Sequence, residues 1–247
     1  MKLKIYYDEA GRGPLAWPVV VGLTLPLDSF DTLLFDDSKK LSEKKREKVF
    51  EYIQQLEKEE KMLHSFGFAT NTEIDNFWIV QSINIAVKRW MIVLIKKFID
   101  SQKKNINWNG DKLLNIEKLN SLILPIFQDI ENIDKYDFKE IISTLSWIEK
   151  LHWILFDGNS DFHLSDDFWF KIITVIKWDG KIPYIWAASI VAKVVRDNYM
   201  KEISSKYPEY NFEKHKWYGT KLHRELIKKY WASEIHRISF LNNILDV

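Results

Sequence analysis

The chain has 247 residues, no cysteine and a formal net charge of +1, with 46% hydrophobic and 29% charged residues. This composition is typical of a globular protein, and the lack of cysteine excludes disulfides, thiolate catalysis and thiolate metal sites. No apolar run approaches the ~20 residues that cross a bilayer, and acids stand where a signal peptide has its apolar region. We therefore expect a cytoplasmic protein with no membrane part.

The N-terminal segment predicts a β-hairpin followed by a helix. Apolar runs over 3–7 and 18–25 are separated by a Gly/Pro-rich turn, which favours paired strands. The segment 37–61 has apolar residues at helical spacing and Ser42 as a candidate N-cap. It predicts an amphipathic helix.

The middle of the chain changes character after one more strand and one more helix. We expect a strand over 64–70 and a long, mostly apolar, buried helix over 79–99. Residues 101–150 are rich in Asn, Lys, Ile and Asp and carry no recognisable motif, which indicates a partly helical insertion. It either decorates the surface or adds a contact to substrate or a partner.

The remaining segments complete an α/β pattern. Apolar runs over 152–158 and 171–180 each end in Asp-Gly, and helices are predicted over 185–207 and about 220–231. Strands that alternate with helices predict an α/β domain, and the opening hairpin makes its central sheet mixed. We place this domain at 1–207 and a small C-terminal helical region at 208–247.

Charge is concentrated near the C-terminus. Residues 181–247 contain 12 Lys/Arg against 7 Asp/Glu, a difference of +5, interleaved with Tyr, Trp and His. Such a segment either binds a phosphate backbone or forms a solvated helical face. Both interpretations stay open on this observation alone.

Four acids share one sequence context. Asp8, Glu9, Asp157 and Asp179 each follow an apolar run and precede a glycine by a few residues. Because neighbouring strand residues point to opposite faces, Asp8 and Glu9 converge only if the strand ends there. Gly11 and Gly13 would allow the chain to bend at that point. Asp157-Gly and Asp179-Gly are equally ordinary as turn formers.

Clustered carboxylates would need a cation to offset their repulsion. With no cysteine and no obvious histidine pair, hard oxygen ligands favour Mg²⁺ or Mn²⁺ over zinc. Two such ions stabilise the attacking and leaving oxygens in phosphodiester hydrolysis. The acids thus indicate a two-metal site.

Six blocks, in chain order, resemble one enzyme family. They are YYDEAGRGPLA, DDSKKLS, the pair FDGN and WDGKIP, AASIVAKVVRD, HKWYGTKLH and IHRISF. In these blocks the chain is similar to ribonuclease HII, and the resemblance covers most of the chain except 101–150. It implies a ribonuclease H-like fold, with the catalytic domain at 1–207 and a substrate-binding region at 208–247.

The resemblance also implies an activity and a set of site residues. The family hydrolyses the RNA strand of RNA–DNA hybrids and cuts at single ribonucleotides embedded in DNA. Its four catalytic, metal-binding acids fall on Asp8, Glu9, Asp157 and Asp179. Its turn that reads the ribose 2′-hydroxyl matches Gly11, Arg12 and Gly13, and its junction-sensing tyrosine matches Tyr218.

The expected chemistry is in-line attack by a metal-activated water on the phosphate 5′ of the ribonucleotide, leaving a 3′-hydroxyl and a 5′-phosphate. Five basic residues are candidate phosphate contacts, with ordinary surface charge as the alternative for each: Lys39, Lys40, Lys193, Arg196 and Lys216. We assign no catalytic role to His215, His223, His236 or Ser189. We expect a monomer that binds RNA–DNA hybrid or ribonucleotide-containing duplex DNA.

Two rival functions remain. One is another nuclease or transferase of the same fold, which would not be expected to carry both the Gly-Arg-Gly turn and Tyr218. The other is a non-catalytic protein that binds RNA–DNA hybrids.

Tryptophan stands where the family has glycine or another small residue. The positions are Trp17, Trp78, Trp90, Trp178, Trp186, Trp217 and Trp231. The chain has 8 glycines and 11 tryptophans, a sum of 19, against roughly 17 glycines expected at this length. We hypothesise that UGA codons are read as glycine and that these positions carry glycine in the cell. The alternative, base-stacking indoles, suits Trp217 but not seven scattered positions.

Overall fold

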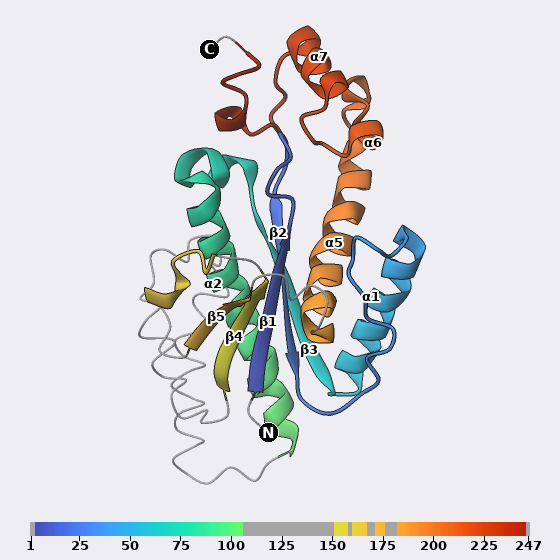
Figure 1. Cartoon of the computed structure of the whole chain (residues 1–247), viewed down its shortest axis with the longest axis vertical. Helices are drawn as coiled ribbons and strands as arrows, with labels where there is room; N and C mark the ends of the chain where they lie inside the picture. Colours follow the sequence, from blue (N-terminus) through green and yellow to red (C-terminus); the bar gives the residue numbers. More distant parts are fainter. Residues whose placement is uncertain (1–2, 106–150, 158–159, 167–170, 176–181, 246–247) are drawn as a thin grey trace.

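A five-stranded sheet forms the centre of the computed structural model, which describes residues 3–105, 151–157, 160–166, 171–175 and 182–245 (Figure 1). The strand order is β3-β2-β1-β4-β5. The strands are β1 (Leu3–Ala10), β2 (Val19–Pro26), β3 (Met62–Ala69), β4 (Leu151–Asp157) and β5 (Lys171–Val175). β1, β2 and β3 pair antiparallel, whereas β1–β4 and β4–β5 are parallel. The predicted mixed sheet is confirmed.

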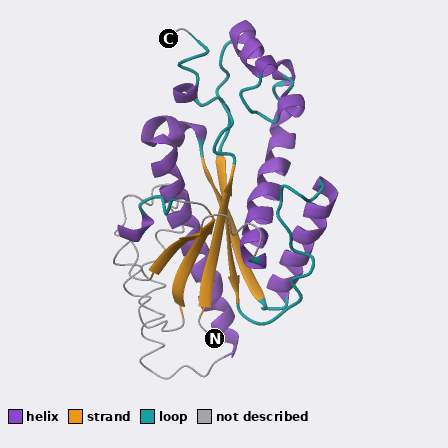
Figure 2. Ribbon diagram, viewed as in Figure 1, coloured by secondary structure: helices purple, strands orange, loops and turns teal. Residues whose placement is uncertain are grey.

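Helices cover both faces of the sheet (Figure 2). α2 (Asn71–Asn105) packs on one face, where its apolar side chains join those of β1 and β2 in the largest core cluster. α5 (Pro183–Ser204) and α1 (Glu43–Lys58) pack together on the other face. α5 approaches β2 so closely that a Cβ on Gly22 would lie 2.3 Å from the Ala188 carbonyl oxygen, so this contact requires glycine.

α2 is long and apolar enough to cross a bilayer by length and composition alone, which corrects the expectation that no such run exists. Within the described chain it is a core helix, since 67% of its most apolar window is buried. It begins at Asn71 rather than 79 and runs to Asn105, so the first residues of the predicted insertion belong to it. Residues 106–150, most of that predicted insertion, lie outside the described residues.

The other predicted elements are found with shifted bounds. α1 begins at Glu43, later than predicted, and Ser42 caps it by accepting a hydrogen bond from the Lys45 amide at 3.4 Å. β1 continues to Ala10, so the strand does not end at Asp8 as the convergence argument required. Pairing with β2 through Ala10 holds this end of the strand extended.

The C-terminal segment forms its own small core at one end of the sheet (Figure 1). Its elements are η4 (Pro208–Tyr210), α6 (Phe212–His215), α7 (Lys221–Tyr230) and η5 (Ile238–Phe240). Leu15, Ala16 and Trp17, from the loop after β1, are buried in the same cluster. The loop between β1 and β2 is therefore packed against residues more than 200 positions later.

Four of the unusual tryptophans have backbone conformations that favour glycine. Trp17, Trp78, Trp217 and Trp231 have φ values of 79°, 63°, 70° and 69°. Trp78 interrupts α2 with ψ 157°, and Trp231 ends α7 with ψ −177°, a region that is essentially specific to glycine. Trp90 and Trp186 lie within α2 and α5, and Trp178 lies outside the described residues. The positive φ values support the glycine hypothesis at four positions.

Candidate active site

A cleft of about 550 Å³ surrounds the end of β1. The loop after β1, the segment before α1, one side of α5 and the segment after α6 supply its walls. Its lining residues are Asp8, Glu9, Ala10, Gly11, Arg12, Ser38, Lys39, Arg46, Ser160, Phe162, Ser189, Lys193, Arg196, Lys216 and Tyr218. Most of the residues predicted from the sequence thus line one cavity.

Asp8 and Glu9 both line the cleft although β1 is still extended at these positions. They pair with Gly22 and Val21 of β2. The Glu9 amide donates to Asp8 Oδ1 at 2.8 Å, and Arg12 Nη1 lies 3.5 Å from Glu9 Oε1. The cleft has walls on both sheet faces, so two carboxylates on opposite sides of one strand reach it without a break in the strand.

The carboxylates of Asp8 and Glu9 affect the pKa of Tyr7, the residue that precedes them. Burial raises the pKa of the Tyr7 hydroxyl well above its ordinary value, and the negative charges of Glu9 and Asp8 raise it further. Its ring packs on Phe156 and Phe162, with ring centroids 4.3 Å and 5.9 Å away. Tyr7 therefore stays neutral, and its ring belongs to the buried core next to the acids.

The backbone register brings a third predicted acid to the same place. Tyr7 of β1 pairs in parallel with Phe156 of β4, and the next residues along the two strands are Asp8 and Asp157. Neighbouring strands lie about 4.8 Å apart, so these two positions are adjacent at the carboxyl ends of β1 and β4. The side chain of Asp157 and all of Asp179 lie outside what is described. The described residues contain no group of three or more potential metal ligands, and the four-acid site stays a prediction.

The turn after β1 packs directly on a buried arginine. Gly11 has φ +99°, and a Cβ there would lie 2.3 Å from Nε of Arg196. Arg196 is only 2% exposed, and its Nε and Nη2 have no hydrogen-bond partner among the described residues. Burial lowers its pKa. A buried guanidinium with unused donors on a cleft wall favours an anion as its partner.

Arg46 of α1 and Lys193 of α5 form a second basic group on the cleft wall. Arg46 Nη2 lies 3.4 Å from Asp197 Oδ2, and Lys193 Nζ lies 2.6 Å from Asp197 Oδ1. Burial lowers the pKa of Lys193, and Asp197 opposes that shift. Arg46 also donates to the Ser38 carbonyl oxygen at 3.1 Å, which ties the segment before α1 to the cleft.

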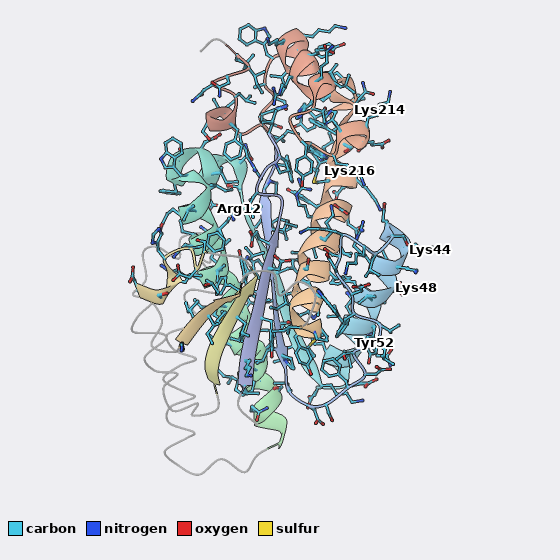
Figure 3. The ribbon with its side chains drawn as sticks, in the orientation of Figure 1. Arg12, Lys44, Lys48, Tyr52, Lys214 and Lys216 are labelled. Carbon is cyan, nitrogen blue, oxygen red and sulfur yellow. The ribbon has the colours of Figure 1, made fainter. Side chains whose placement is uncertain are left out.

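Tyr218 and Lys216 form the wall that the C-terminal segment contributes. Tyr218 is 50% exposed, and a Cβ on Gly13 would lie 3.6 Å from its Cε1, so the ring stands beside the turn. Figure 3 shows Arg12 and Lys216 at the same end of the sheet. Lys40 differs from the other predicted contacts, because it pairs with Asp36 at 3.7 Å and does not line the described cleft.

Sequence reasoning missed several cleft residues. Arg46 lies in the charged run KKREK, where nothing distinguishes it from its exposed neighbours. Ser189, to which the sequence assigns no catalytic role, also lines the cleft, and its Oγ lies 2.8 Å from Ser38 Oγ. The guanidinium of Arg12 lies 5.3 Å from the Phe162 ring, a contact with no sequence signal.

Comparisons with known proteins agree along nearly the whole chain. The family model described as ribonuclease HII matches residues 5–243. Proteins named ribonuclease HII from Clostridioides difficile and Caldicellulosiruptor bescii are 35% and 36% identical, covering 96% and 97% of this chain and 69% and 87% of their own lengths.

Solved structures show the same fold at lower identity. RNase HII from Archaeoglobus fulgidus, solved in complex with PCNA, matches with a TM-score of 0.57 and 19% identity over 98% of this chain and 96% of that one. Bst-RNase HIII in complex with Mn²⁺ matches with a TM-score of 0.53 and 15% identity over 97% of this chain and 67% of its own. These likenesses confirm the predicted ribonuclease H-like fold.

Proposed function

The chain belongs to the ribonuclease HII family, and we propose that it hydrolyses the RNA strand of RNA–DNA hybrids and cuts 5′ of single ribonucleotides in duplex DNA. The products would carry 3′-hydroxyl and 5′-phosphate ends. One observation carries the proposal: a single cleft contains adjacent carboxylates, a glycine turn, a basic wall and an exposed tyrosine. Together these groups suit metal-assisted cleavage of a phosphodiester beside a ribose.

The carboxylates fit a divalent cation. Asp8 and Glu9 present hard oxygen donors in a cleft with no described cysteine or histidine in its lining, which suits Mg²⁺ or Mn²⁺. We propose that Asp8, Glu9, Asp157 and Asp179 hold two ions. When bound, these ions would activate water and stabilise the charge of the attacking and leaving oxygens.

The basic wall would hold the phosphates. Arg196 supplies buried, unused N–H donors beside Gly11, and Lys193 is held on the same helix face by Asp197. Lys39 and Lys216 are exposed at the rim of the cleft. Charged donors in a partly buried site bind an anionic oxygen more strongly than they would in water.

The turn and Tyr218 would select the ribonucleotide. Glycine at 11 and 13 leaves the backbone open to close approach, and a 2′-hydroxyl is the group that distinguishes RNA from DNA at one nucleotide. Tyr218 stands next to Gly13 with half of its surface exposed, so its ring can pack on the neighbouring sugar. This geometry supports recognition of a junction between ribose and deoxyribose.

Cleavage of a DNA duplex with one internal ribonucleotide, in Mg²⁺ or Mn²⁺, tests the proposal. We expect a single cut 5′ of the ribonucleotide, no cut in the all-DNA duplex and loss of cutting in Asp8→Asn. Asp28→Asn, in the exposed turn after β2, serves as the matched control and should retain activity. If the wild type and a chain with the Trp→Gly changes both bind the duplex without cutting it, the rival binding function is correct. Undiminished cutting by Asp8→Asn would also refute the proposal.

A further inference from the structure

Arg237 is a fully buried cation that binds the loop between β1 and β2. Its guanidinium donates four hydrogen bonds, all to main-chain carbonyl oxygens of that loop. Nη2 bonds to Gly11 at 2.7 Å, Nη1 to Arg12 at 2.8 Å and to Pro14 at 2.9 Å, and Nε to Trp17 at 2.7 Å. Because the guanidinium fork is planar and rigid, these bonds fix the orientation of four peptide groups at once.

Backbone hydrogen bonds reinforce this link. The Arg237 amide donates to the Leu15 carbonyl oxygen at 2.9 Å, and the Trp17 amide donates to Ile235 at 2.8 Å. On its other side the loop is bonded to the segment that carries Tyr218, since the Leu15 amide donates to the Trp217 carbonyl oxygen at 2.9 Å. The loop is therefore held between two parts of the C-terminal segment.

His236, next to Arg237, is linked to Tyr218 through a second histidine. His223 Nδ1 lies 3.0 Å from the Tyr218 carbonyl oxygen, and His223 Nε2 lies 3.1 Å from His236 Nε2. The Ser233 amide donates to His236 Nδ1 at 3.0 Å. A carbonyl oxygen only accepts, so His223 carries its proton on Nδ1 and His236 carries its proton on Nε2. Both rings are neutral in this arrangement.

We infer that His236 and Arg237 are positioning residues that set the Gly11–Gly13 turn and Tyr218 at a fixed spacing. Neither residue is among those that line the described cleft, so each acts through the groups it holds. The inference rests on the proposed function, in which the turn contacts the ribose and Tyr218 contacts the next sugar. A fixed spacing between them is what recognition of a single ribose–deoxyribose junction requires.

The test compares two substrates cleaved by the same enzyme. One is a DNA duplex with a single ribonucleotide, which needs both the turn and Tyr218 in register, and the other is a continuous RNA–DNA hybrid, which contains no such junction. We expect Arg237→Lys to lower the ratio of kcat/KM for the first substrate over the second by about 10- to 100-fold, because a displacement near 1 Å costs about that much. An ammonium has three donors and cannot bond four carbonyl oxygens together.

Controls separate positioning from loss of folded protein. Ile227→Val changes a buried residue of the same C-terminal core and should lower stability without changing the ratio, because unfolding removes both activities equally. In a Tyr218→Ala background, Arg237→Lys should change the ratio much less than in the wild type. Circular dichroism at the assay temperature verifies folding. If Arg237→Lys does not fold, His236→Gln tests the inference in its place, because it alters the hydrogen bond between His236 and His223 that leads to Tyr218.

The outcomes are distinguishable. If the wild type cleaves neither substrate, the proposed function fails. If the wild type cleaves both and the folded variants keep its ratio, the proposed function stands and the positioning inference is wrong. A lower ratio in the wild-type background that is lost in the Tyr218→Ala background supports the inference.

Discussion

The backbone at Trp231 predicts a reversal in the usual ranking of alanine and glycine. Trp231 ends α7 at φ 69° and ψ −177°, and the residue is 69% exposed. A residue with a Cβ in this region costs about 1–3 kcal/mol relative to glycine, whereas glycine loses about 0.5–1 kcal/mol to alanine through backbone entropy. We therefore expect Trp231→Gly to be more stable than Trp231→Ala by about 0.5–2 kcal/mol.

Trp90 supplies the matched control. It lies inside α2 with a helical backbone, so Trp90→Gly should be less stable than Trp90→Ala by about 1 kcal/mol. Both members of each pair lack the indole, so the loss of its packing cancels in the comparison. Urea unfolding with a constant m-value measures the differences. If glycine is also the less stable residue at position 231, the strain argument is refuted.

A separate measurement tests the glycine hypothesis. An intact mass and a peptide map of the protein isolated from its natural source would show glycine at positions such as 17 and 217 if UGA is read as glycine. Tryptophan at those two positions would exclude it. Because Trp217 is buried and stacks on Phe212 with ring centroids 3.5 Å apart, cleavage assays should compare the chain with and without Trp→Gly changes.

Three further predictions concern acid stability, salt and metal. Burial lowers the pKa of His223 to about 3 and of His236 to about 4, so the unfolded chain takes up protons first. The contribution of these histidines to the free energy of unfolding is fully present above about pH 6.5. It should fall on acidification by roughly 1.4 kcal/mol per pH unit and per histidine, down to about pH 3–4. His236→Gln should reduce this slope against pH, as measured by urea unfolding at a series of pH values. Lys39→Met should weaken binding to an RNA–DNA hybrid and lower the magnitude of the slope of log K against log salt concentration by about 0.9. The control Lys48→Met, on α1 and outside the cleft lining (Figure 3), should change neither the affinity nor the slope. Equal effects of the two substitutions would mean that the phosphates bind elsewhere. Chelation of divalent cations should abolish cleavage. In thermal unfolding, Mn²⁺ at 100 times its Kd should stabilise the wild type by about 2.7 kcal/mol and Asp8→Asn by less. Equal stabilisation of the two proteins would show that Asp8 binds no metal.

Local chemistry and the order of the elements follow from the sequence alone. Strand-like runs predicted β1, β2 and β3 and the mixed sheet, because period and turn residues are local properties. Asp8, Glu9 and the Gly-Arg-Gly turn were identified because they are adjacent in the chain. The resemblance places glycine at positions 17 and 217, and both residues have a positive φ.

Which charged side chains are buried, and which groups they bind, depends on how distant segments pack together. Arg237 looks like one more surface charge in the sequence, yet its carbonyl partners lie more than 200 residues earlier. The sequence leaves Arg196 as either a phosphate contact or an ordinary surface charge, and the structure buries it beneath Gly11 on the cleft wall. Burial of a charge depends on partners that the fold supplies from distant segments, and no local pattern encodes where those partners will be.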